Sequence, residues 1–333
     1  MKNNNEDQLH WSEEKEVIKT NRPLVLLLSL MKKLPAAFVF VLIYPISFFY
    51  FIFSKRARDE GSNYQKILRS YTGGVSPKRI SPFLQILSFT LCVMEKMEGW
   101  LGNYKYNKLV VHDDDLKELQ EQLEQGKGAL LICSHLGNME LMRSLASFGE
   151  DGVNRTVGVT AVIEVNATEQ FNRTLNQINP NVNFQVLDPS LIGPDTIITL
   201  QERIDNGGLV VITGDRTSAR SRMRVIREKF LGREADFPYG VFVLGMLLNA
   251  PIYYVFGLRT KTATLFPRYN MFVEKSVVDF NCTRFERNER IMELCREFIQ
   301  KLEKYCIKFP YQWYNFYNFW LCNEEMEVDG ANA

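Results

Sequence analysis

The stretch ALLICSHLGNME, residues 129–140, decides which fold class this chain can adopt. Its first five residues form a continuous apolar run, which is typical of a strand buried on both faces of a parallel sheet. The other predicted strands are 108–112, 156–162, 182–187, 209–213 and 252–258. The predicted helices are 113–125, 139–148, 195–204, 237–248 and 283–306. Strands that alternate with helices predict an α/β fold, with a central and mostly parallel sheet flanked by helices.

His135 and Glu140 lie at the junction that follows the 129–133 strand. On one continuous helix their side chains would point about 140° apart, so they can meet only if the chain turns between them. Gly137 suits such a turn, and Asn138 suits the N-cap of a helix that carries Glu140 in its first turn. Glu140 would then orient one ring nitrogen, while the other takes a proton from a hydroxyl or an amine. The alternative is a histidine bonded to a loop carbonyl and an ordinary first-turn acid.

A second informative stretch runs from Leu34 to Phe53 without a charged residue. As a helix its twenty residues would extend roughly 30 Å, the hydrocarbon thickness of a bilayer. We therefore predict a hydrophobic N-terminal membrane helix, with a buried core helix as the alternative. Pro35 and Pro45 leave open whether the segment spans the bilayer or lies half-inserted, and basic residues flank both ends.

Overall charge and composition exclude several classes of protein. The chain has 40 Lys and Arg against 39 Asp and Glu, so no global field attracts nucleic acid. Six scattered cysteines without a Cys-x-x-Cys pair indicate a reducing compartment. Three histidines far apart in sequence do not predict a zinc site. The serine-hydrolase elbow, the Walker A loop and the dinucleotide-binding glycine motif are not present in the sequence.

Five stretches carry further information: SHLGNMEL at 134–141, TGDR at 213–216, DFPYGV at 236–241, APIY at 250–253 and FPYQWY at 309–314. Together they resemble signatures of the lipid A late acyltransferases, a branch of the lysophospholipid acyltransferase superfamily. The chain has Met139 where these enzymes usually have tryptophan, and Asn-Phe-Tyr-Asn-Phe-Trp at 315–320 where they typically have His-Arg-Arg. With these departures, the chain resembles a divergent bacterial branch of predicted acyltransferases.

The resemblance implies a lysophospholipid acyltransferase-like fold and the transfer of an acyl group to a hydroxyl or amine of a membrane lipid or glycolipid. The donor would be a thioester of acyl carrier protein or coenzyme A, with no metal or other cofactor. The expected location is the cytoplasmic face of the bacterial inner membrane. The implied catalytic residues are His135 and Glu140, and the implied substrate-binding residues are Gly137, Asn138, Asp215 and Arg216.

The expected organisation has five segments. They are a polar or amphipathic segment at 1–33, the membrane helix at 34–53, a helical linker or lid at 54–105, the catalytic domain at 106–322, and a flexible acidic tail at 323–333.

Several charged and aromatic stretches allow further interpretations. The basic run at 216–233 predicts contacts of Arg220, Arg222 and Arg224 with an acidic carrier protein or lipid phosphates, or else a solvated face. Asp113–Asp115 would suit a metal-dependent membrane glycosyltransferase, although acids at a helix N-terminus explain them more simply. The sequence is also compatible with a non-catalytic membrane scaffold, or with a hydrolase that uses water as the acceptor. The aromatic segment 311–320 lacks the basic residues that a nucleic-acid partner would require.

Overall fold

The computed structural model describes residues 36–100, 109–111, 114–139, 153, 155–163, 184–189, 192–217, 224–264 and 268–320. The described helices are α2 (Ala36–Phe53), α3 (Lys55–Tyr71), α4 (Pro82–Trp100), α5 (Asp114–Glu124), α8 (Pro194–Asp205), α9 (Tyr239–Leu247) and α10 (Arg287–Lys308). The described strands are β1 (Leu109–Val111), β2 (Ala129–Cys133), β3 (Val159–Val162), β4 (Phe184–Leu187), β5 (Leu209–Thr213), β6 (Val225–Phe230), β7 (Arg233–Pro238), β8 (Ile252–Arg259) and β9 (Tyr269–Lys275).

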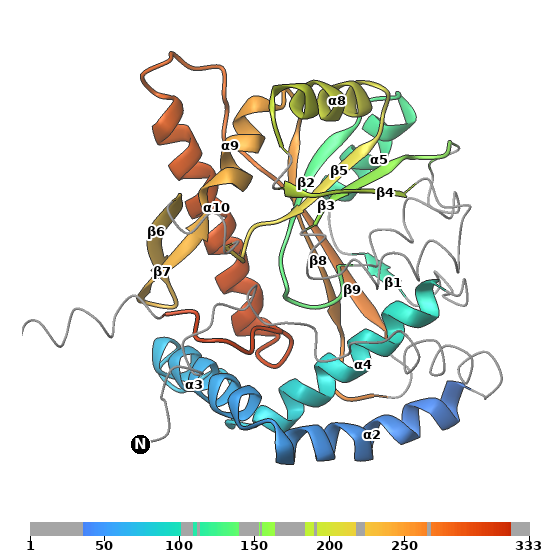
Figure 1. Ribbon diagram of the computed structural model, residues 1–333, viewed down its shortest axis with the longest axis vertical. Coiled ribbons are helices and arrows are strands. Elements are labelled where there is room, and N and C mark those ends of the chain that lie inside the picture. The colour runs from blue at the N-terminus through green and yellow to red at the C-terminus, as the bar shows by residue number, and fades with distance from the viewer. Residues whose placement is uncertain are drawn as a thin grey trace, which may run out of the picture.

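A seven-stranded sheet forms the centre of the described structure, in the order β1-β9-β8-β2-β5-β3-β4 (Figure 1). Every neighbouring pair is parallel except β8 and β9, which run antiparallel. The predicted α/β class and the mostly parallel sheet are confirmed. The predicted strands at 129–133 and 209–213 have the same bounds in the structure, and most of the predicted helix at 139–148 lies outside the described residues.

The apolar residues of β2 divide between the two faces of the sheet, as the alternation of a strand requires. Leu130 and Ile132 belong to one buried cluster, which also contains residues of α8, α9 and α10. Ala129, Leu131 and Cys133 belong to a second cluster, together with the apolar side of α5. A strand covered on both faces explains why this stretch reads as an unbroken apolar run.

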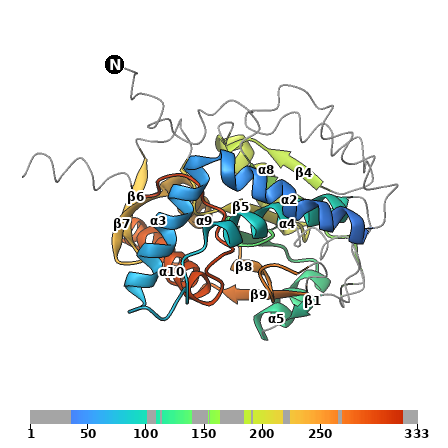
Figure 2. The same ribbon diagram turned by 90° about the horizontal axis from the view of Figure 1, so that it is seen from below.

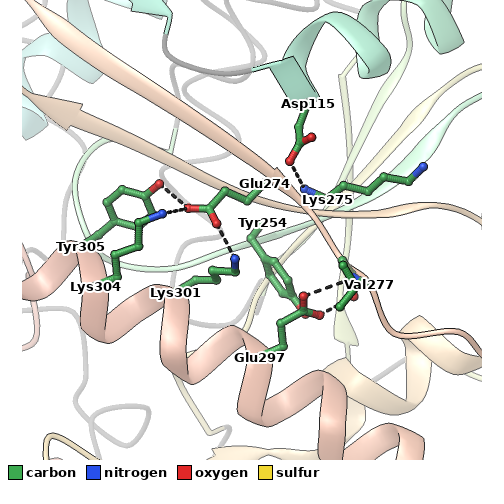
Figure 3. A network of polar contacts seen from close by, with 10 residues as sticks. Asp115, Tyr254, Glu274, Lys275, Val277, Glu297, Lys301, Lys304 and Tyr305 are labelled. Atoms are coloured by element: carbon green, nitrogen blue, oxygen red, sulfur yellow. Dashed lines mark hydrogen bonds and ion pairs between the residues drawn. The ribbon is translucent and has the colours of Figure 1, made fainter.

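Carboxylates fix α10 and α5 against the antiparallel strand β9 (Figure 3). Glu274 accepts hydrogen bonds from Lys301 at 2.5 Å and Lys304 at 2.7 Å, and also from the Tyr305 hydroxyl. Burial alone would raise the pKa of Glu274, but these donors lower it to about 2. Asp115 accepts the backbone N–H of Lys275 at 2.9 Å, so this carboxylate stabilises the packing of α5 on β9.

Helices α2, α3 and α4 form an N-terminal helical layer below the sheet in Figure 1. Seen from below, α2 crosses the molecule alongside α4 (Figure 2). The end of α3 contacts α10, because the Tyr71 hydroxyl donates to Glu303 at 3.2 Å. The interpretation of 34–53 as a helix is confirmed for 36–53, with Pro45 inside the helix. The membrane-spanning interpretation is not supported, since no helix in the described part of the chain is both long and apolar enough to cross a bilayer.

Candidate active site

His135 and Asp215 meet because β2 and β5 are parallel neighbours in register. Cys133 of β2 pairs with Thr213 of β5, and each strand is followed two residues later by one of these two side chains. The carboxyl ends of parallel strands meet at one edge of a sheet, where α/β proteins place their sites. The sheet therefore brings together residues that are 80 positions apart.

The side chains of His135 and Asp215 form a closely bonded pair. Nδ1 of His135 lies 2.8 Å from Oδ1 of Asp215, and the backbone N–H of His135 donates to Oδ2 at 2.8 Å. Nε1 of Trp313 also donates to Oδ2, at 3.1 Å. Asp215 is 1% exposed, whereas the imidazole is 26% exposed. An ionised carboxylate at Nδ1 favours the tautomer with its proton on Nδ1, which leaves Nε2 as the basic nitrogen.

The loop after β2 is fixed to two other segments. Gly137 has a φ of 80°, and a Cβ at this position would lie 2.2 Å from the carbonyl oxygen of Gly257. The N–H of Gly137 donates to the Gln312 carbonyl at 2.8 Å, and the N–H of Asn138 donates to the Gly257 carbonyl at 2.7 Å. The backbone of Tyr314 donates to the His135 carbonyl at 3.0 Å. Gly137 and Asn138 therefore shape the turn that presents the imidazole.

Burial and neighbouring charges shift the pKa values of both groups in the pair. Burial lowers the pKa of His135 below its usual value, the positive charge of Arg216 lowers it further, and Asp215 acts in the opposite direction. Burial by itself would raise the pKa of Asp215, but its charge and hydrogen-bond interactions with His135 hold it below the usual value. The pair therefore combines a neutral imidazole with an ionised carboxylate near neutral pH.

His135 opens into a cavity of about 280 Å³ between the sheet edge and the N-terminal helical layer. Its lining residues are Arg56, Phe89, Lys96, His135, Gly137, Met139, Arg216, Tyr314, Phe316 and Tyr317. Arg216 donates to the Tyr314 carbonyl at 2.9 Å, and its guanidinium carbon lies 5.9 Å from the centre of the Tyr317 ring. The guanidinium is therefore held against the cavity wall.

Four further residues were predicted to belong to the site. Three of them, Glu140, Arg220 and Arg222, lie outside the described residues. Arg224 is exposed next to β6, in a hairpin with β7 that the sequence interpretation of a loop or helix face did not foresee. Within the described ranges, no group of three His, Cys, Asp or Glu side chains could hold a metal ion.

Trp313 and Gln312 contact the residues of the candidate site, although the sequence assigned them no individual role. Trp313 is fully buried and bonds Asp215, while Gln312 holds the Gly137 turn through its carbonyl. The amide side chain of Gln312 also bonds the backbone N–H and carbonyl of Arg259, each at 2.8 Å. The FPYQWY motif was the available signal, because a glutamine and a tryptophan within an apolar segment suggest buried polar partners.

A second cavity, of about 550 Å³, opens at the opposite edge of the sheet. Gly128 and Pro251 line it, and these residues directly precede β2 and β8. It therefore lies at the amino ends of these strands. Because sites in such sheets form outside the carboxyl ends of the strands, we place the candidate active site at the smaller cavity.

A protein-family model matches most of the chain. The family model described as bacterial lipid A biosynthesis acyltransferase matches residues 88–321, which is more than two thirds of the chain and includes His135, Asp215 and Trp313. None of the curated proteins matches the chain. The chain therefore belongs to the bacterial lipid A biosynthesis acyltransferase family, and it is an acyltransferase that acts on lipid.

Proposed function

We propose that the chain transfers an acyl group from a thioester of acyl carrier protein or coenzyme A to a hydroxyl or amine of a membrane lipid or glycolipid. His135 is the proposed general base. The observation that carries this proposal is the His135–Asp215 contact of 2.8 Å at the wall of a cavity. With Nδ1 engaged by the carboxylate, Nε2 is the nitrogen that can take a proton.

The reaction needs no covalent acyl-enzyme. Nε2 of His135 takes the proton of the acceptor hydroxyl or amine as that group attacks the thioester carbonyl. The tetrahedral intermediate then collapses, the carbon–sulfur bond breaks, and the proton passes from His135 to the leaving thiolate. The products are an ester or amide and a free thiol.

Two neighbouring residues have proposed supporting roles. Asp215 orients the imidazole and stabilises the imidazolium that forms during proton transfer. Arg216, whose guanidinium is held by the Tyr314 carbonyl, contributes positive charge where the carbonyl oxygen becomes negative. The pairing of His135 with Glu140 stays a prediction. A carboxylate bonded at Nε2 would occupy the nitrogen that the mechanism needs, so we propose Asp215 as the orienting acid.

An acyl-transfer assay tests this function directly. The purified full chain is incubated with labelled acyl-coenzyme A or acyl carrier protein, with and without lipid extracted from bacterial inner membranes. We expect a labelled lipid that forms only when the extract is present. Labelled free fatty acid formed at the same rate with and without lipid would instead identify a hydrolase.

We propose that α2 lies in the membrane interface with its exposed apolar side chains in the lipid, at the cytoplasmic face. Its exposed residues are Phe38, Val41, Leu42, Pro45, Ile46, Phe48, Phe49, Tyr50, Ile52 and Phe53. A contiguous apolar face of this kind marks an interaction surface. Lys55 and Arg56 follow directly and suit anionic headgroups.

Charges on this face should weaken membrane binding. We expect the double variant Ile46→Asp/Phe49→Asp to bind anionic phospholipid vesicles at least about tenfold more weakly, because each large apolar side chain contributes about 1.5–3 kcal/mol when buried. Vesicle co-sedimentation measures this. Ile198→Asp on α8, an exposed isoleucine away from α2, is the matched control and should bind normally. Equal binding by all three proteins would contradict the docking of α2.

Loss of the Trp313 hydrogen bond should change the pKa of His135 and leave the imidazole in place. In Trp313→Phe, Asp215 loses a donor to Oδ2. The carboxylate then interacts more strongly with the imidazolium, so the pKa of His135 should rise. The acidic limb of the pH profile of kcat/KM should therefore move to higher pH. We also expect kcat to fall about tenfold.

The control for this variant is Trp320→Phe. Trp320 is also buried, and its Nε1 donates to the Phe230 carbonyl at 3.3 Å rather than to Asp215. Trp320→Phe should therefore leave the acidic limb in place. Equal shifts in the two variants would show that Trp313 acts only through packing.

A further inference from the structure

Helix α4 carries a stripe of buried polar residues on the face that it turns toward the candidate site. The helix lies between α2 and the sheet (Figure 1), and most of its residues are apolar. Spacings of three, four and three residues place the members of this polar stripe on one side of the helix. They are Gln85, Ser88, Cys92 and Glu95. Apolar side chains would pack here without the cost of burying polar groups, so the polar stripe requires an explanation of its own.

Two members of the polar stripe bond consecutive residues of the segment that contacts the candidate site. Nε2 of Gln85 donates to the carbonyl of Trp313 at 2.7 Å. The hydroxyl of Ser88 lies 2.8 Å from the hydroxyl of Tyr314. The indole of Trp313 in turn donates to Oδ2 of Asp215 at 3.1 Å. One residue therefore separates Gln85 from the carboxylate that is bonded to the imidazole.

The other two members contact the turn after β2 and the end of β8. Sγ of Cys92 donates to the carbonyl of Gly137 at 3.7 Å, behind the turn that presents the imidazole. A carboxylate oxygen of Glu95 lies 3.2 Å from Nη2 of Arg259, and both side chains are buried. None of the four members is among the described residues that line the cavity beside the imidazole. The polar stripe therefore contacts the framework around the site.

The amide group of Gln85 is itself fixed in one orientation. Nε2 of Gln65, on α3, donates to Oε1 of Gln85 at 2.8 Å, and Oε1 of Gln65 accepts the backbone N–H of Ser81 at 2.5 Å. Because Oε1 of Gln85 accepts this hydrogen bond, the NH2 group of the same amide faces the Trp313 carbonyl. The side chains of both glutamines are fully buried. A chain of hydrogen bonds thus runs from α3 through α4 to the residue that bonds Asp215.

We propose that Gln85 is a positioning residue for the base, held by Gln65 and acting on Asp215 through Trp313. The proposal rests on the acyl-transfer function above and adds two residues of the N-terminal helical layer to it. Buried polar networks whose members are bonded make a core rigid and select one arrangement of it. The family match begins at residue 88, so both glutamines lie outside the matched region.

The pKa of His135, measured by nitrogen NMR on the purified full chain, tests this role without a catalytic step. In Gln85→Met, a side chain of similar length cannot donate to the Trp313 carbonyl, so the indole loses its alignment on Asp215. The carboxylate then interacts more strongly with the imidazolium, as in Trp313→Phe. We expect the pKa of His135 to rise by about 0.5. We also expect kcat to fall about fivefold at an unchanged KM, because Gln85 does not line the cavity.

Tyr254→Phe is the matched control for the loss of a buried hydrogen bond. The Tyr254 hydroxyl donates to the Leu294 carbonyl at 3.2 Å, so its removal weakens the packing of α10 on β8. The pKa of His135 should stay in place in this variant. The charged groups that act on this pKa are the same in both variants, and they include Arg216, Asp215 and Lys96.

A second variant displaces the same amide without removing a polar group. Gly61 lies on α3, where a Cβ would be 3.0 Å from Oε1 of Gln85. Gly61→Ala should therefore shift the amide and raise the pKa of His135, by less than Gln85→Met does. Its control is Gly240→Ala on α9, where a Cβ would meet no atom within 4 Å, so the pKa should not change. This pair decides the question if Gln85→Met does not fold.

Unchanged pKa values in Gln85→Met and Gly61→Ala would overturn the proposal, as would an equal rise in Tyr254→Phe. The double variant Gln85→Met/Trp313→Phe should raise the pKa no further than Trp313→Phe alone, because both changes remove the same hydrogen bond to Asp215. An additive rise would contradict the route through Trp313. Because the pKa is a property of the imidazole in the resting protein, this result is separate from the role of His135 as a base, which His135→Ala tests.

Discussion

His135→Ala is expected to lower kcat for acyl transfer by about 10³-fold or more, because it removes the group that takes the acceptor proton. The imidazole is 26% exposed and forms its side-chain bond only with Asp215 among the described residues. The buried Asp215 loses this partner but keeps the backbone N–H at position 135 and Nε1 of Trp313 as donors, so we expect the variant to remain folded. Steady-state transfer from a labelled acyl thioester to lipid measures the effect.

Two controls separate catalysis from folding in this variant. Its circular dichroism spectrum and its binding to vesicles should match those of the unaltered protein, since α2 is unchanged. His10→Ala, which removes a histidine from the N-terminal region, should keep full turnover. Acyl transfer at a normal rate by folded His135→Ala would refute the base assignment.

Asp215→Asn should reduce kcat nearly as strongly, by about 10³-fold, although the shape of the side chain is preserved. The amide cannot stabilise the imidazolium, and its NH2 group can donate to Nδ1 and shift the ring proton to Nε2. Removal of the negative charge also lowers the pKa of His135 further, since Asp215 now raises it. The acidic limb of the residual kcat/KM should therefore move to lower pH.

The matching variant Glu140→Gln shows which of the two carboxylates contributes more to turnover. With Nδ1 already bonded to Asp215, we expect the larger loss and the shifted acidic limb in Asp215→Asn. A large loss in Glu140→Gln, combined with near-normal turnover in Asp215→Asn, would assign the orienting role to Glu140.

The fold was most predictable where strands are buried on both faces. The runs at 129–133 and 209–213 are continuous and apolar because helices cover each side of the sheet. Strand β9, with the sequence YNMFVEK, pairs antiparallel with β8. It was not predicted, because polar residues interrupt its apolar run. The β6–β7 hairpin was missed because one side of it carries the charges of the basic run while Ile226 and Phe230 are buried.

Individual residues of the site could be predicted from the sequence, but the contacts between them could not. His135 and Asp215 were both singled out, yet their contact depends on the parallel register of β2 and β5, which local sequence does not encode. The role of Trp313 depends on a contact across 98 positions. Arg56 reaches the cavity only because the N-terminal helical layer packs over the sheet edge, and that packing is tertiary information.

The protonation state of the imidazole shows whether His135 is a neutral base held by Asp215. Nitrogen NMR of the ¹⁵N-histidine-labelled protein resolves this state, because the chain has only three histidines and His135→Ala identifies the relevant signals. We expect a proton on Nδ1, an unprotonated Nε2 at neutral pH, and a pKa below that of an ordinary histidine. A ring protonated on Nε2, or an imidazolium at neutral pH, would contradict the assignment of His135 as the base.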